Sequence, residues 1–186
     1  MNEEDQKVVD LQVEKIAGNK SPQDKAIVSN IFVDIFQYGM TIMQAVGLSS
    51  GLVEMIFNYA SELYAAEKYE EAMPLFHFIC QMNHRDVRYV YGCGACYHKC
   101  HRYLQAVSCY TMAHSLDPDN PIYCYHGADC FLQLNQPESA RVMLAAAIGA
   151  AGDAPQHQKL KQQAICMCDV IYETMQEQAA AGSGSS

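Results

Sequence analysis

Cysteine and histidine are the residues of this 186-residue chain that could do the most chemistry, with nine of the first and seven of the second. The densest group is a C-x2-C-x3-C-H run made of Cys93, Cys96, Cys100 and His101, with His98 beside it. A structural zinc site needs four such ligands in a tetrahedron. These cysteines recur at helical spacing, however, and no second C-x2-C pair follows, since Cys166 and Cys168 are separated by one residue. We therefore predict buried thiols acting as small apolar side chains, without metal or cofactor.

The histidines give no indication of catalysis. They are His77, His84, His98, His101, His114, His126 and His157, and none stands in a nucleophile, H-E-x-x-H or phosphate-loop context. We predict that the protein is not an enzyme.

Charge and composition exclude other classes. A net charge of -9 disfavours binding to nucleic acid and to anionic membranes, because both need basic residues. The first ten residues carry five charges and resemble no signal peptide, and no apolar run is long enough to cross a membrane. An odd number of cysteines without an export signal favours reduced thiols in the cytoplasm.

A period of 34 residues organises the middle of the chain. It links three alanines, Ala72, Ala106 and Ala140, and four further columns of similar residues keep the same register. These columns resemble the tetratricopeptide repeat, in which small residues let two antiparallel helices approach and bulky ones fill the space between them. The expected repeats are residues 53–86, 87–120 and 121–154, with turns near 67–69, 101–103 and 135–137.

The predicted fold is all-α, with three repeats in a short right-handed superhelix between two flanking helices. We expect a mobile segment at 1–22 and a single domain at 23–178. This domain begins with an N-terminal region at 23–50, whose helix runs from about Gln23 to Val46 and is interrupted by Gly39. It ends with a capping helix at 155–178, and a flexible tail or linker occupies 179–186.

The first helix of each repeat should line a groove. Four positions of that helix share one face at helical spacing, and the fifth residue of each repeat is aromatic. A groove with an aromatic floor suits an extended peptide, although the same rings could instead pack against the N-terminal segment or a second copy. The predicted peptide-binding residues are Phe57, Ser61, Tyr64, Arg88, Tyr91, Ala95, His98, Ile122, Tyr125, Asp129 and Leu132.

Three stretches carry a narrower resemblance: LYAAEKYEEAMPLFHFIC, YGCGACYHKCHRYLQAVSCYTMA and YHGADCFLQLNQPESA. They resemble the SycD/LcrH class of chaperones from bacterial type III secretion, over about residues 30–175. The most specific parts are the GCGAC run at 92–96 and a set in the third repeat, His126, Asp129, Cys130, Leu132 and Gln133.

The resemblance implies a cytoplasmic bacterial chaperone that keeps hydrophobic translocator proteins soluble and unassembled before secretion. An extended N-terminal segment of the translocator, with a short Pro/Leu-type motif, would lie in the groove. Phe57, Tyr64 and Tyr125 match the aromatic positions of the class. Ser61 departs from the pattern, because relatives can be aromatic there, and Tyr91 stands where at least one relative is aliphatic.

Two alternatives concern the groove and one concerns assembly. A clamp for a partner's C-terminal carboxylate is disfavoured, because the groove offers Arg88 alone, beside Glu54 and Asp129. A general adaptor unrelated to secretion would share the fold and the groove. The apolar region at 31–43 fits either a homodimer contact, as is common in the class, or a cap on the repeats.

Overall fold

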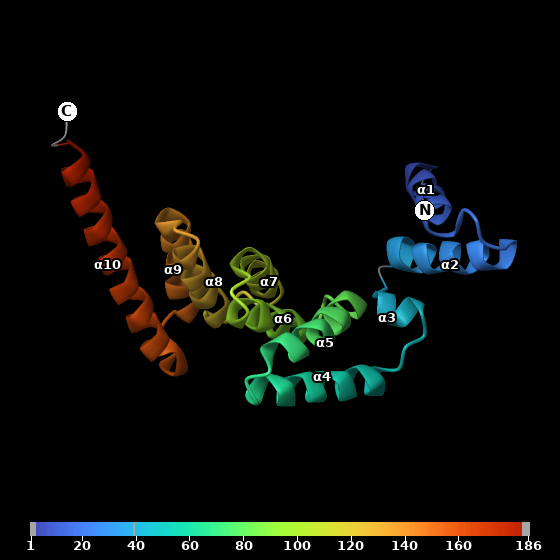
Figure 1. Cartoon of the computed structure of the whole chain (residues 1–186), viewed down its shortest axis with the longest axis horizontal. Coiled ribbons are helices and arrows are strands. Elements are labelled where there is room, and N and C mark those ends of the chain that lie inside the picture. The colour runs from blue at the N-terminus through green and yellow to red at the C-terminus, as the bar shows by residue number, and fades with distance from the viewer. Residues whose placement is uncertain (1–2, 39, 184–186) are drawn as a thin grey trace.

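The computed structural model describes residues 3–38 and 40–183, and all regular structure within them is helical. The elements are α1 (Glu3–Ala17), α2 (Pro22–Tyr38), α3 (Ile42–Ala45), α4 (Ser50–Ala65), α5 (Tyr69–Met82), α6 (Val87–Lys99), α7 (Tyr103–Leu116), α8 (Ile122–Gln133), α9 (Pro137–Ala151), the 3-10 turn η1 (Pro155–His157) and α10 (Gln158–Ser183). Helices α4 to α9 form three antiparallel pairs that follow one another along the molecule (Figure 1).

The repeat columns form the core of these pairs. Small residues lie at the crossing points of each pair and are fully buried: Ala60 and Ala72, Gly94 and Ala106, Ala128 and Ala140. The bulky column of Phe76, Tyr110 and Leu144 fills the space beside them and is at most 3% exposed. Small side chains allow the backbones to approach closely, and the large ones restore the packing density of a protein interior. The all-α tetratricopeptide architecture is therefore confirmed.

The turn inside each repeat is built the same way three times. Glu67, His101 and Asn135 occupy the same repeat position and all adopt positive φ, between 56° and 61°. In each case the amide of the following residue donates to a carbonyl five residues earlier, as Lys68 does to Leu63 at 2.9 Å. This is the Schellman motif, which satisfies the free carbonyls at the end of a helix.

The N-terminal region differs from its sequence-based description. The segment expected to be mobile contains α1, which packs on α2 and buries Val9 and Ala17. The helix expected from Gln23 to Val46 is divided into α2 and α3, and Thr41 starts α3 with a capping box to Gln44. Gly39, the predicted interruption, lies outside the described residues.

The two ends of the molecule are unlike each other. The α1–α2 hairpin is joined to the repeats through α3, which contacts α5, and it stands apart from them in Figure 1. At the opposite end, α10 packs along α9 and continues five residues into the expected tail, to Ser183. Among the described residues, no helix has the length and apolar character that a membrane span requires.

Candidate functional site: a groove along α4, α6 and α8

A largely apolar pocket of about 350 Å³ opens between α4 and α6. It is lined by six of the eleven residues predicted to bind a peptide: Phe57, Ser61, Tyr64, Arg88, Tyr91 and Ala95. We call it the aromatic pocket. Its walls come from helices of two successive repeats, so the stacking of the repeats creates it. A pocket of this size, with aromatic walls and few polar groups, can take one or two apolar side chains of a bound chain.

The floor of the aromatic pocket contains further residues that are not among the eleven predicted. Phe76 belongs to the buried packing column, and Gly92 and Tyr123 also line the pocket. An added Cβ at Gly92 would lie 2.3 Å from the Phe76 ring, so this ring can reach the pocket only because residue 92 is glycine. The glycine was visible in the sequence, but the approach of Phe76 depends on how two repeats stack.

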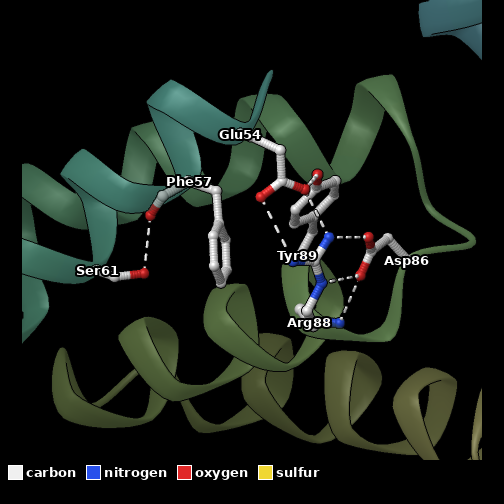
Figure 2. Close-up of polar contacts among 6 residues, drawn as sticks. All are labelled: Glu54, Phe57, Ser61, Asp86, Arg88 and Tyr89. Carbon is white, nitrogen blue, oxygen red and sulfur yellow. Dashed lines mark hydrogen bonds and ion pairs between the residues drawn. The ribbon is translucent and has the colours of Figure 1, made fainter. Parts of the chain in front are cut away.

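Charged residues form a closed network at one rim of the pocket (Figure 2). The Arg88 guanidinium lies 2.6 Å from Glu54 Oε1 and 2.6 Å from Asp86 Oδ2, and the Tyr89 hydroxyl donates to Glu54 at 2.8 Å. The hydrogen bonds from Arg88 lower the pKa values of Glu54 and Asp86, so both carboxyls stay ionised. Arg88 also lies over the Phe57 ring, 5.2 Å from its centroid.

This network defines what the rim can bind. Two carboxylates already neutralise Arg88, so the guanidinium is not available as an unpaired cation for a partner's terminal carboxylate. The paired Arg88 instead fixes the orientation of Phe57, which it covers. The Ser61 hydroxyl is likewise already hydrogen-bonded, because it donates to the Phe57 carbonyl at 2.8 Å (Figure 2). Polar groups at this end therefore support the pocket wall.

A cluster of histidines and tyrosines separates the aromatic pocket from the far end of the groove. His98 Nε2 lies 3.0 Å from Asp129 Oδ2, and the His126 ring stacks on Tyr110 with centroids 5.6 Å apart. Burial lowers the pKa of His98 and outweighs the opposite effect of Asp129, and burial and His98 lower the pKa of His126. At neutral pH both rings are therefore uncharged, and the contact between His98 and Asp129 is a hydrogen bond without a full ion pair.

A second apolar pocket of about 320 Å³ lies where the groove reaches α10. Tyr125 and Leu132 of α8 form one wall, and Met167, Val170 and Ile171 of α10 form the other. We call it the C-terminal pocket. Two of the predicted peptide-binding residues lie here, but the contribution of α10 cannot be predicted from the repeat positions, because that helix lies outside the repeat register.

The remaining predicted groove residues lie between or behind the pockets. His98 and Asp129 form the polar cluster described above. Ile122 is half-buried and packs against the cluster of Val90, Ala113 and Tyr123, which places it partly in the core. The eleven residues therefore divide into the aromatic pocket, a polar middle, the C-terminal pocket and one packing position.

Eight of the nine cysteines are buried or half-buried among the packed helices, and Cys166 of α10 is exposed. All nine are free thiols, and Cys93 and Cys96 are at most 1% exposed within the core. Among the residues that the structure describes, no group of three or more His, Cys, Asp or Glu side chains is arranged to hold a metal ion.

Comparison with known proteins agrees with this architecture. A family model described as a tetratricopeptide repeat matches residues 99–164. The low calcium response locus protein H of Yersinia pseudotuberculosis is 29% identical over 133 residues, which cover 72% of this chain and 79% of that protein.

Solved structures extend the similarity to three dimensions. The type III secretion chaperone SycD of Yersinia enterocolitica, in complex with a peptide of the translocator YopD, is 27% identical with a TM-score of 0.65, over 69% of this chain and 98% of that one. PcrH of Pseudomonas aeruginosa, in complex with the chaperone-binding region of PopB, is 31% identical with a TM-score of 0.61, over 65% of this chain and 98% of that one. With its repeats, its groove and these relatives, the chain belongs to the SycD/LcrH family of type III secretion translocator chaperones.

Proposed function

We propose that the protein is a cytoplasmic, non-enzymatic chaperone of a bacterial type III secretion system. It binds an extended N-terminal segment of a hydrophobic translocator in the groove and keeps that protein soluble and unassembled before secretion. The observation that carries the proposal is the aromatic pocket, found in a chain similar to a chaperone solved with a translocator peptide.

The shape of the groove fits an extended segment. A short strand-like peptide rises about 3.3 Å per residue and turns alternate side chains to the same side. Its apolar side chains would enter the aromatic and C-terminal pockets, and its backbone would cross the polar middle near His98 and Asp129. The proposed contact residues are the eleven predicted from the sequence, together with Phe76, Tyr123 and the α10 wall.

The benefit to the bound protein follows from mass action. A translocator with exposed apolar segments aggregates in water, and a receptor that binds those segments lowers the concentration of the aggregating form. The chaperone therefore needs affinity for apolar side chains but no chemistry, which agrees with a site whose charged groups are already paired.

A peptide-binding titration tests the site. The probe is a fluorescent peptide from the N-terminal segment of the translocator encoded in the source genome. The double variant Phe57→Ala/Tyr64→Ala removes two aromatic walls of the pocket, and we expect affinity to fall at least about tenfold, or about 1.4 kcal/mol. Leu104→Ala is the matched control, because Leu104 is 64% exposed on α7 and lines neither pocket. Equal affinity of the folded double variant and the control would rule out the aromatic pocket as the site.

The general adaptor is the second candidate, and co-purification separates it from the chaperone. Tagged protein is recovered from cytosol of the source organism, and its partners are identified by mass spectrometry. A secretion chaperone should retain one or two proteins with long apolar segments and lose them with the double variant. Recovery of only soluble partners that lack such segments would leave the groove in place and assign it to an adaptor.

We infer that the dimer contact predicted at 31–43 extends over the N-terminal hairpin, because residues 31–35 of α2 are half-buried while α1 exposes more apolar surface. Its apolar residues Val8, Leu11 and Ile16 on α1 are 45–59% exposed, so they lack a partner within the described chain that would cover them. Replacing Leu11 and Ile16 by lysine should convert a dimer to a monomer in light scattering. A monomeric wild type, or a dimer that persists in the variant, would contradict this contact.

A further inference from the structure

Three thiols from three successive helices meet on the side of α6 that faces away from the groove. Cys93 of α6 is buried in the core of the first two repeats, and Cys80 of α5 and Cys109 of α7 pack against that core from either side. All three line a pocket of about 680 Å³, which is open to solvent. Only Cys93 belongs to the C-x2-C-x3-C-H run, so the spacing of cysteines along the chain does not predict this cluster.

The cluster differs from ordinary buried cysteines in its hydrogen bonds. Cys93 shares hydrogen bonds with both Cys109 and Cys80, and these contacts, together with burial, raise the pKa of Cys93. The same hydrogen bond from Cys93 lowers the pKa of Cys109 and, on the other side, that of Cys80. The thiol whose pKa is raised is thus the buried Cys93, and its single S–H proton can be donated to one half-buried neighbour at a time, which makes that neighbour a thiolate more easily.

Helices α6 and α7 approach each other closely beside Cys93 and Cys109. An added Cβ at Gly94, the residue after Cys93, would lie 3.0 Å from Cys109 Cβ, so α6 and α7 are in near contact at this level. A disulfide needs Cα atoms roughly 4.4–6.8 Å apart, so a bridge between two helices requires a close approach of this kind.

We propose that Cys93 and Cys109 form a peroxide-responsive dithiol site, in which Cys109 is the reactive thiol and Cys93 the resolving one. The Cys109 thiolate attacks one oxygen of hydrogen peroxide, the O–O bond breaks, and hydroxide leaves to take up the proton that Cys109 had lost. Cys93 then displaces the hydroxyl of the Cys109 sulfenic acid, its own proton leaves with that hydroxyl as water, and the S–S bond forms. Two thiols lose two hydrogens, and one peroxide becomes two waters.

Such a bridge would tie α6 to α7 within the second repeat. Because α6 also carries Tyr91, Gly92 and Ala95 into the aromatic pocket on its other face, the dithiol and the groove share one helix. The site therefore goes beyond the proposed chaperone activity, and its chemistry does not depend on whether a translocator binds.

The test uses the reduced full-length protein with hydrogen peroxide, followed by alkylation of the remaining thiols and peptide mapping by mass spectrometry. We expect a Cys93–Cys109 bridge in the wild type, and the same bridge in Cys166→Ser, which removes an exposed cysteine on α10, and in Cys80→Ser. Cys109→Ser should abolish it. A bridge joining any other pair, or peroxide that oxidises Cys166 while Cys109 stays reduced, would overturn the assignment.

A second measurement follows the hydrogen bond without any oxidant. Cys93→Ser keeps a donor beside Cys109, whereas Cys93→Ala removes it. The rate of Cys109 alkylation by iodoacetamide near neutral pH should therefore fall by roughly threefold or more in Cys93→Ala relative to Cys93→Ser. Circular dichroism establishes that both variants are folded, and equal rates in the two would show that Cys93 does not activate Cys109.

Discussion

Gly92 determines the shape of the aromatic pocket more directly than any of the aromatic residues around it. The Phe76 ring occupies the space in which a side chain at position 92 would lie, with three ring atoms within 2.9 Å of an added Cβ. A larger residue there would push Phe76 out of its position in the core, where it is 3% exposed. The absence of a side chain at position 92 therefore allows both the packing of Phe76 and the shape of the pocket.

Replacing this glycine by alanine should lower stability. Gly92→Ala forces a buried aromatic ring to move, and overpacking of this kind costs about 1–3 kcal/mol. Gly149→Ala is the matched control, because Gly149 lies in α9 with no atom within 4 Å of its added Cβ. That change should raise stability by about 0.5–1 kcal/mol through helix propensity. Urea denaturation measures both, and effects of equal sign would contradict the assigned role of Gly92.

Replacing Glu67 by glycine should raise stability, in contrast to the loss expected for Gly92→Ala. Glu67 holds a positive φ of 61° in the turn of the first repeat, a conformation that costs an L-residue about 1–2 kcal/mol. Glycine adopts it freely but loses more entropy on folding, so Glu67→Gly should stabilise the protein by about 0.5–1 kcal/mol. Glu62→Gly, on the exposed surface of α4, should cost about 1 kcal/mol instead. A destabilised Glu67→Gly variant would show that the glutamate side chain contributes more than its backbone costs.

The sequence supports residue-scale predictions unevenly. The eleven groove residues follow from repeat positions, because a helix turns the same positions to the same face in each copy. The roles of Phe76 and Gly92 cannot be predicted in this way, because they arise from the way one repeat stacks on the next. The thiol cluster cannot be predicted from repeat positions either, because Cys80, Cys93 and Cys109 occupy three different repeat positions on three helices.

Helices α4 to α9 are the elements that the sequence predicts best. Their small and bulky columns repeat three times, so each copy supports the interpretation of the others, and the predicted turns contain the three residues of positive φ. The flanking helices lack a second copy. The helix expected from Gln23 to Val46 is divided in the structure, and α1 lies in the segment at 1–22 that was expected to be mobile because chain termini are usually poorly ordered.

Helix α10 should divide into a required and a dispensable part. Its Ala164 and Ile171 are buried against the third repeat, in the cluster that contains Ala140 and Leu144. Ending the chain after residue 178 removes neither, and the melting temperature should stay the same. Ending it after residue 162 uncovers that cluster, and we expect a loss of about 2–5 kcal/mol, comparable to deleting large core side chains. Differential scanning calorimetry compares the two, and equal losses would contradict this division of α10.

At the scale of the whole molecule, the histidines couple stability to pH. The pKa values of His98 and His126 lie below the ordinary value of 6.5, chiefly because both are buried. As the pH falls below 6.5, the unfolded chain takes up protons that the folded chain does not yet bind. The free energy of unfolding should therefore be fully present above about pH 7 and decline below 6.5, by about 1.4 kcal/mol for each unit of pKa difference.

Urea denaturation at about pH 7.5 and about pH 5.5 measures this dependence. The variant His126→Gln removes one of the two groups, so its stability should fall less between the two pH values than that of the wild type. His157→Gln is the control, because His157 lies in η1, away from the groove. A decline of equal size in the wild type and in both variants would assign the pH dependence to carboxyl groups instead.

The order of the helices along the chain has a consequence for synthesis. All residues that line the aromatic pocket lie between Phe57 and Tyr123, and each helix from α4 to α9 packs mainly on its neighbours in sequence. Contacts this local form early and do not require the C-terminus, so folding can proceed from the N-terminal side while the chain still leaves the ribosome. A nascent chain can therefore complete its principal binding pocket before α10 has left the ribosome, and that helix then adds the second pocket to a receptor that is already in place.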